Sequence, residues 1–184
     1  FLIRNVIYKF DVNWCHTVIC GNSNYKYMKK LCDSISKNIK IIKLDIDNLD
    51  IKMYSDLLQT NEFWNLFDSE KIFLYQEDSV VFKSNIKDFL EYDYIGAPWA
   101  HLEQIGGNGG CSLRTRDVML KCLQKNQPYF PEDIYYSRTI QKYNLGKLPD
   151  KNIAIQFGEE CINSNNIPFS GHKFWLSGNK KLLN

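Results

Sequence analysis

The chain has 184 residues, of which 44% are hydrophobic and 14% aromatic, and its formal net charge is only +2. This composition is typical of a folded domain with a sizeable core, and it excludes a disordered chain and a small disulfide scaffold. The lysines are scattered and form no basic stripe, so we do not expect nucleic-acid binding. No apolar stretch reaches the ~18 to 20 residues that a membrane span needs.

Six cysteines are dispersed along the chain without a Cys-x-x-Cys pair, at positions 15, 20, 32, 111, 122 and 161. This spacing argues against a zinc knuckle and favours reduced, mostly buried thiols, with one or two disulfides as the alternative. Together with the lack of a charged-then-apolar leader, it favours a cytoplasmic location. The first residue is Phe1 and not Met, which leaves room for other domains in a longer protein.

The first half of the chain alternates short apolar runs with amphipathic segments, which are typical of strands and helices respectively. This order predicts an α/β fold with right-handed crossovers, a mostly parallel central sheet flanked by helices, and a Rossmann-like N-terminal half. No Gly-x-Gly-x-x-Gly or Walker loop is present, so a nucleotide would be held by other means. We expect strands at Val6–Phe10, Thr17–Cys20, Lys40–Leu44 and Lys71–Tyr75, and helices at Asn24–Ser36 and Ser55–Phe67.

Four polar residues follow the strand predicted at Lys71–Tyr75, in the order Gln76, Glu77, Asp78 and Ser79, and the middle two are acidic. Parallel α/β sheets place their chemistry beyond the carboxyl ends of strands. Glu77 and Asp78 are therefore candidates for a metal or phosphate site. The alternative is a turn in which Asp78 and Ser79 cap the next segment.

The second half contains a dense glycine stretch, because residues 106–110 hold four glycines and Asn108. A short helix at Ile86–Tyr92 and a strand at Tyr94–Ala97 are predicted before it, and a strand at Cys111–Arg114 after it. So many glycines do not suit the interior of an element, and the backbone must adopt positive φ or lie close against something. We expect a planar or sugar ligand to approach it, with a flexible hairpin tip as the alternative.

Pro131, Glu132 and Asp133 open a helix that is predicted to continue to Tyr143. Acidic residues in a first helical turn complement the helix dipole, which is their ordinary role. A carboxylate held there by backbone amides can also act as a general base.

The C-terminal region is predicted to contain a strand at Ile153–Phe157 and an aromatic loop at Pro168–Trp175. His172 lies in this loop next to a glycine and a lysine, so we do not expect it to be a core histidine. His16 and His101 have no such context and are interpreted as structural or solvated.

Four features follow one another along the chain. They are acidic residues at a strand end, a glycine-rich stretch before a strand, a Glu-Asp pair at a helix start and a histidine near the C-terminus. That order resembles the GT-A glycosyltransferases, and most closely a poorly characterised glycosyltransferase-like domain family. The Asp-Tyr-Ile-Gly-Ala-Pro-Trp and Gly-Asn-Gly-Gly-x-Ser-Leu-Arg motifs are the specific ones. The blocks that carry the resemblance are Asn61–Trp64, Gln76–Ser79, Phe89–Trp99, Gly107–Arg114, Pro131–Ser137, Phe157–Glu160 and Gly171–Trp175.

The resemblance implies a single GT-A-like domain over residues 1–184, with a nucleotide-binding half at 1–80 and an acceptor and catalytic half at 81–184. It also implies a metal ion bound by the aspartate that ends the strand motif and by the C-terminal histidine. Because imidazole suits Mn²⁺ better than Mg²⁺, manganese is the favoured ion. The metal candidates are Asp78, Glu77 and His172.

Such an enzyme moves a sugar from a nucleotide-sugar donor to a hydroxyl of a glycan or protein acceptor. Asp133 matches the aspartate that acts as base in inverting β-1,3-type transferases, and Glu132 is the runner-up. Gln76 replaces the first aspartate of the strand-end motif, so the resemblance implies a less negative metal site. The donor-binding candidates are Gln76, Asp78 and Lys173, the last by neutralising the diphosphate.

Because sugars stack their apolar faces on aromatic rings, we expect the acceptor or sugar pocket to be formed by Trp99, Asn108, Gly109 and Gly110, with ordinary core packing as the alternative for Trp99. Two other classes of function are alternatives. One is a sugar-binding or inactive pseudo-transferase domain, which the replaced aspartate favours. The other is a metal-dependent phosphoryl or nucleotidyl enzyme, in which Glu77, Asp78 and Asp133 would converge on two ions.

Overall fold

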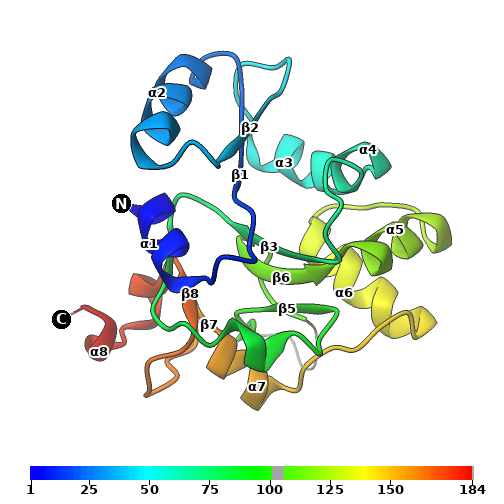
Figure 1. Ribbon diagram of the computed structural model, residues 1–184. Helices are drawn as coiled ribbons and strands as arrows, with labels where there is room; N and C mark the ends of the chain where they lie inside the picture. The colour runs from blue at the N-terminus through cyan, green and yellow to red at the C-terminus, as the bar shows by residue number, and fades with distance from the viewer. Residues whose placement is uncertain (101–105, 184) are drawn as a thin grey trace.

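Helices and small sheets alternate along the chain in the computed structural model, which describes residues 1–100 and 106–183 (Figure 1). Together they form one mixed α/β domain. The helices are α1 (Leu2–Lys9), α2 (Tyr25–Ile35), α3 (Ile51–Leu58), α4 (Asn61–Trp64), α5 (Arg116–Lys125), α6 (Glu132–Tyr143), α7 (Lys151–Phe157) and α8 (Lys180–Leu183), with short 3₁₀ helices η1 (Ile86–Phe89) and η2 (Phe174–Ser177). The strands are β1 (Thr17–Cys20), β2 (Lys40–Lys43), β3 (Lys71–Tyr75), β4 (Ser79–Val81), β5 (Tyr94–Gly96), β6 (Cys111–Thr115), β7 (Gly158–Glu159) and β8 (Ser170–His172).

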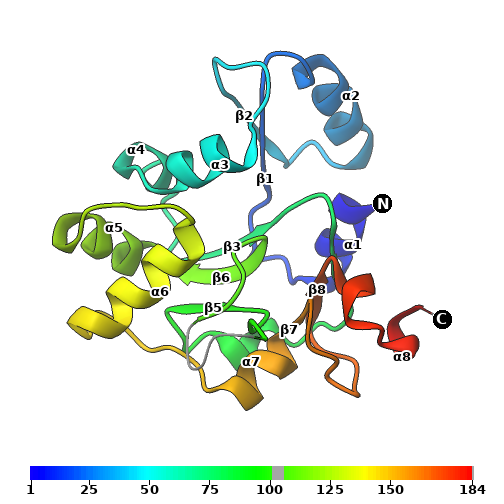
Figure 2. The same cartoon turned by 180° about the vertical axis from the view of Figure 1, so that it is seen from behind.

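The first predicted β-α-β unit is present. β1 and β2 pair in parallel, with Thr17 opposite Lys40 and Cys20 opposite Lys43, and α2 connects them. In both views this unit stands beside the other sheets (Figures 1 and 2). The predicted strands at Thr17–Cys20 and Lys40–Leu44 and the helix between them are therefore confirmed.

The prediction of a mostly parallel central sheet is wrong. β3 and β5 both pair antiparallel with β6, while β4, β8 and β7 form a separate mixed sheet. The apolar run Lys71–Tyr75 is a strand as predicted, but an apolar run specifies neither the partner nor the direction of pairing. The β3–β6 register places Tyr75 opposite Cys111, so the end of β3 lies beside the glycine stretch that precedes β6.

Two segments predicted as strands are helical. Val6–Phe10 belongs to α1 and its C-cap, and the two end residues of this segment, four apart, are only 1% and 8% exposed, as a buried helix face requires. Ile153–Phe157 belongs to α7, where the Asp150 side chain caps the helix by accepting from the Ile153 amide at 3.0 Å. Short apolar runs fit either element, and in α7 the cap residue decides between them.

The helix predicted at Ser55–Phe67 begins earlier, at Ile51, and is divided into α3 and α4. The division occurs because the Thr60 side chain caps α4 and accepts a hydrogen bond from the Phe63 amide at 3.2 Å. The aromatic loop expected at Pro168–Trp175 contains the buried strand β8. The helix predicted to open at Pro131 is confirmed as α6.

Two clusters of buried side chains lie on opposite faces of the β3–β6–β5 sheet. Ile72 and Tyr94 join the cluster formed with α3, α4, α5 and α6, whereas Ile95 and Leu113 join a cluster with α1, η1 and α7. Figure 2 shows α5 and α6 on one side of this sheet and α7 near β5. β6 is buried at all five positions, so the residues next to it are held firmly in place.

No disulfide forms among the six cysteines, all of which lie in the described ranges, as the dispersed spacing predicted. Within residues 1–100 and 106–183, no helix combines the length and the apolar character needed to cross a bilayer. The buried cysteines are Cys20, Cys32, Cys111 and Cys122, and the exposed ones are Cys15 and Cys161.

Candidate functional site

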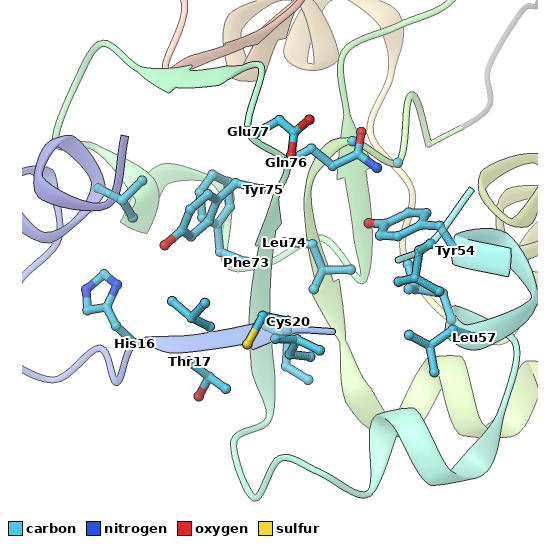
Figure 3. Close-up of a pocket in the computed structure, with 18 of the residues that line it drawn as sticks. His16, Thr17, Cys20, Tyr54, Leu57, Phe73, Leu74, Tyr75, Gln76 and Glu77 are labelled. Atoms are coloured by element: carbon cyan, nitrogen blue, oxygen red, sulfur yellow. The ribbon is translucent and has the colours of Figure 1, made fainter. Parts of the chain in front are cut away.

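A cleft of about 1290 Å³ lies between β1, α3 and β3 and reaches the glycine stretch and the start of α6. Figure 3 shows Phe73 and Tyr75 on one side of β3, and Leu74 and Gln76 on the other side together with Tyr54 of α3. The residues predicted for the site that line this cleft are Gln76, Glu77, Asp78, Asn108, Gly109, Gly110, Glu132, Asp133, His172 and Lys173.

Strand register brings Asp78 and His172 together from distant parts of the chain. Asp78 directly precedes β4, and β4 pairs antiparallel with β8 so that Ser79 lies opposite His172. The Lys173 amide donates to the Asp78 carbonyl at 3.1 Å, which continues the pairing past the strand end. His172 is only 3% exposed, so the expectation that this histidine lies outside the core is wrong. The residue lies on a buried strand, and it lines the cleft.

Three potential ligand atoms converge at the His172 ring. Its Nε2 atom lies 3.0 Å from Asp78 Oδ1 and 3.2 Å from Gln76 Oε1. Although Asp78 Oδ1 is buried and close to this nitrogen, it accepts no hydrogen bond of good geometry from the residues that the structure describes. A buried carboxylate oxygen without a donor is costly, so this arrangement suits a proton or a metal ion between the three atoms.

Glu160 contacts the other side of the same ring, and the sequence analysis did not name it as a site residue. Glu160 Oε1 lies 3.0 Å from His172 Nδ1. Its position one residue beyond β7, which pairs in parallel with β8, explains why the two side chains meet. The available sequence signal was the pair Glu159–Glu160 after an apolar segment, but local spacing does not show that β8 lies alongside.

The donor set at this point is one imidazole nitrogen, one carboxylate oxygen and one amide oxygen. In the described part of the chain, no group of three or more His, Cys, Asp or Glu side chains has metal-site geometry. Gln76 takes the place of a third such ligand, and its neutral oxygen can still bind a hard cation. The set therefore fits an ion such as Mn²⁺ that accepts both nitrogen and oxygen. Glu77 is exposed and has no contact with these three atoms among the described hydrogen bonds.

The glycine stretch packs closely against site side chains. A Cβ atom on Gly110 would lie 2.4 Å from His172 Nε2, and one on Gly109 would lie 2.1 Å from Glu132 Oε1. Gly107 adopts a φ of 112°, a conformation that favours glycine. The density of glycine thus serves close approach, as predicted, but what approaches in this structure are side chains of the chain itself.

Asp133 lies at the start of α6 on the other side of the glycines from His172. Its Oδ2 atom accepts from the Gly109 amide at 3.2 Å, and Oδ1 accepts from the Ile134 amide at 2.8 Å. Burial, assisted by the neighbouring Glu132 charge, raises the pKa of Asp133 to about 6, although both amides act in the opposite direction. A carboxylate of that pKa is ionised at neutral pH and is a stronger base than an ordinary aspartate.

Glu132 has a different environment. Both of its oxygens bind Arg114 of β6, at 2.5 Å and 2.9 Å, in a bidentate pair, and the Arg114 side chain is fully buried. The guanidinium lies 4.6 Å from the Tyr94 ring and 5.9 Å from the Trp64 ring. The charged Arg114 guanidinium holds both Glu132 oxygens, whereas Asp133 binds only neutral backbone amides, so Asp133 is the better placed of the two carboxylates to accept a proton.

The remaining predicted residues are spread around these groups. Lys173 Nζ lies 3.5 Å from Asp78 Oδ2 and is partly exposed, so it can also meet an anion in the cleft. Asn108 Oδ1 accepts from the Gly110 amide at 2.7 Å. Trp99 is half-buried and is not among the described residues that line the cleft. His16 lines the cleft far along the sequence from these groups, and His101 lies outside the described residues.

A search of curated proteins found no significant match to this chain. A family profile described as "Protein of unknown function (DUF5672)" matches residues 38–172, which include Gln76, Asp78, Asp133, Glu160 and His172. The match covers most of the chain and extends from just before β2 to the end of β8. The chain therefore belongs to the DUF5672 family.

Proposed function

We propose that this protein is a GT-A-type glycosyltransferase that moves a sugar from a nucleotide-sugar donor to a hydroxyl acceptor with inversion, assisted by a divalent cation. The observation that carries the proposal is the convergence of Asp78, Gln76 and His172 in a cleft that also holds Asp133. A cation site and a basic carboxylate side by side match the two needs of sugar transfer, which are a stabilised leaving group and an activated nucleophile.

The leaving group is a nucleoside diphosphate, on which negative charge increases as the sugar departs. Asp78 Oδ1, Gln76 Oε1 and His172 Nε2 would hold a divalent cation, with Mn²⁺ favoured over Mg²⁺ because of the imidazole ligand. When bound, the cation supplies positive charge next to the diphosphate. Lys173, which lies 3.5 Å from Asp78, adds a second positive charge at the same end of the cleft.

Asp133 accepts the proton of the acceptor hydroxyl as that oxygen attacks the anomeric carbon and the bond from this carbon to the diphosphate breaks. Its pKa of about 6 leaves it ionised at neutral pH and able to take a proton. The backbone amides of Gly109 and Ile134 hold the carboxylate in position. Gly109 and Gly110 separate this base from the His172 ring, so the sugar between them would lie against the glycine backbone and Asn108.

The proposal is tested by thermal-shift titration with UDP, GDP, CMP and their sugar derivatives, with and without Mn²⁺. A ligand at about 100 times its dissociation constant adds ~2.7 kcal/mol of stability, which such a titration detects easily. We expect one nucleotide class to stabilise the wild-type protein in a Mn²⁺-dependent way and to lose this effect in Asp78→Ala.

Other outcomes point to other functions. Stabilisation by glycans but by no nucleotide favours a sugar-binding or inactive pseudo-transferase domain, a possibility that the neutral Gln76 supports. Nucleotide hydrolysis without any sugar favours a metal-dependent phosphoryl or nucleotidyl enzyme. Either result would overturn the transferase assignment.

A further inference from the structure

We propose that Glu160 is a positioning residue that fixes the tautomer and the direction of the His172 ring, and thereby sets the affinity of the Asp78–Gln76–His172 group for a divalent cation. This inference rests on the cation site of the proposed function. It concerns a residue that binds neither the cation nor the sugar and acts only through the imidazole.

The position of Glu160 follows from the pairing of β7 with β8. Glu159 lies opposite Gly171, so the next residue, Glu160, comes alongside His172. Glu160 is only 9% exposed, and its Oε1 atom is 3.0 Å from His172 Nδ1. The contact between Glu160 and His172 is therefore buried, and the pairing of β7 with β8 brings the two residues together.

The neighbouring acid is already fully engaged. Glu159 Oε2 accepts from the Ser164 hydroxyl at 2.6 Å and from the Asn179 amide group at 2.9 Å, and Ser177 donates to its Oε1. The hydrogen-bond partners of Glu159 thus differ from those of Glu160, so the two acids have separate tasks. Glu159 fastens the C-terminal segment, and Glu160 faces the imidazole.

The protons of the ring follow from its partners. A carboxylate only accepts, so His172 Nδ1 donates its proton to Glu160. In the neutral ring, Nε2 then presents a lone pair, and it faces Asp78 Oδ1 at 3.0 Å and Gln76 Oε1 at 3.2 Å. Three electron-rich atoms directed at one point repel each other unless a positive charge lies between them, and this is the arrangement that a cation needs.

Two residues of the glycine stretch, Asn108 and Gly110, also help to hold the His172 ring in place. Asn108 Nδ2 lies 3.4 Å from Glu160 Oε1, and Asn108 Oδ1 accepts from the Gly110 amide at 2.7 Å. Gly110 itself packs against the imidazole so closely that a Cβ atom would reach within 2.4 Å of Nε2. Asn108 thus connects the glycine backbone to the same carboxylate that orients the ring.

The test is a Mn²⁺ titration of wild-type protein, Glu160→Gln and Glu91→Gln, with free Mn²⁺ measured by electron paramagnetic resonance. Glu91 is an exposed carboxylate that is paired with Lys147 and is not among the described residues lining the cleft, so its variant carries the same change of charge outside the cleft. Loss of a ring-orienting carboxylate costs about 10-fold to 100-fold in metal affinity. We expect that loss in Glu160→Gln and an unchanged affinity in Glu91→Gln.

Nitrogen NMR of the His172 ring in the metal-free proteins at pH 8 supplies a second readout that does not depend on activity. We expect the proton on Nδ1 in wild type and Glu91→Gln, and a larger share on Nε2 in Glu160→Gln. If Glu160→Gln does not fold, Glu160→Asp keeps the charge but withdraws the carboxylate, and it should weaken Mn²⁺ binding too.

The failure of this inference differs from failure of the proposed function. Wild-type protein that binds Mn²⁺ no more tightly than Glu160→Gln refutes the role of Glu160 and leaves the transferase proposal intact. Wild-type protein that binds no Mn²⁺ refutes the cation site, and an unchanged tautomer in Glu160→Gln then refutes the positioning role as well.

Discussion

Replacement of Asp133 by asparagine should lower the activity, and it should change the free energy of unfolding by an amount that depends on pH. The raised pKa means that the folded protein favours the protonated carboxyl, whereas the unfolded chain releases the proton near the ordinary value of 3.8. The stability contributed by this group is therefore complete below about pH 3.8 and is lost as the pH rises through about 6. At neutral pH the ionised carboxylate destabilises the wild-type fold.

The magnitude follows from the two pKa values. The interval from 3.8 to about 6, at about 1.36 kcal/mol per pH unit, amounts to about 3 kcal/mol. Because water reaches part of this side chain, we expect ~1.5 to 3 kcal/mol. Asparagine can accept from only one of the two amides that Asp133 binds, at a cost of about 1 to 3 kcal/mol that does not vary with pH.

The assay is urea unfolding at pH 4 and pH 7.5, followed by the fluorescence of the four tryptophans. From pH 4 to pH 7.5, the free energy of unfolding of Asp133→Asn should increase by ~1.5 to 3 kcal/mol relative to that of wild type. Turnover of the variant should fall by about 10² to 10⁴-fold. Asp117→Asn is the matched control, because Asp117 also lies in a first helical turn but is exposed. A stability difference that is equal at both pH values would refute the raised pKa, and full activity would refute the role as base.

Two other replacements test neighbouring parts of the structure. Arg114→Met leaves Glu132 buried and unpaired, so the free energy of unfolding measured in urea should fall by about 3 to 5 kcal/mol, and the double variant with Glu132→Gln should recover part of it. A loss below about 1 kcal/mol in the single variant would contradict this reasoning. Gly110→Ala places a Cβ atom 2.4 Å from His172 Nε2, so the ring must move and Mn²⁺ affinity, measured by calorimetry, should drop about 10-fold or more. Unchanged affinity would show that the ring position is not critical.

The elements that sequence reasoning predicted correctly are those whose signal is local. α2 and α6 have apolar residues at helical spacing, and β1, β2 and β3 are apolar runs of strand length. α1 and α7 were mistaken for strands because a five-residue apolar run fits both, and the decisive cap at Asp150 was not weighed. The antiparallel pairing of β3 with β6 has no local signal at all.

The candidate site shows the same division. Asp78, Asp133 and His172 were identified from motifs, and all three line one cleft. Glu160 was missed because its importance depends on β7 lying beside β8, a contact between segments that spacing does not show. Trp99 was included for its aromatic ring, but it is not among the described residues that line the cleft.

The groups around the His172 ring come from widely separated parts of the chain, and Gln76 and His172 are 96 positions apart in the sequence. A contact of that span exists only when β4, β8 and the glycine stretch are packed together. Any ligand of this ring therefore binds the completed fold alone and stabilises the chain as a whole. The first 80 residues and the remainder share one binding event, and neither part carries it separately.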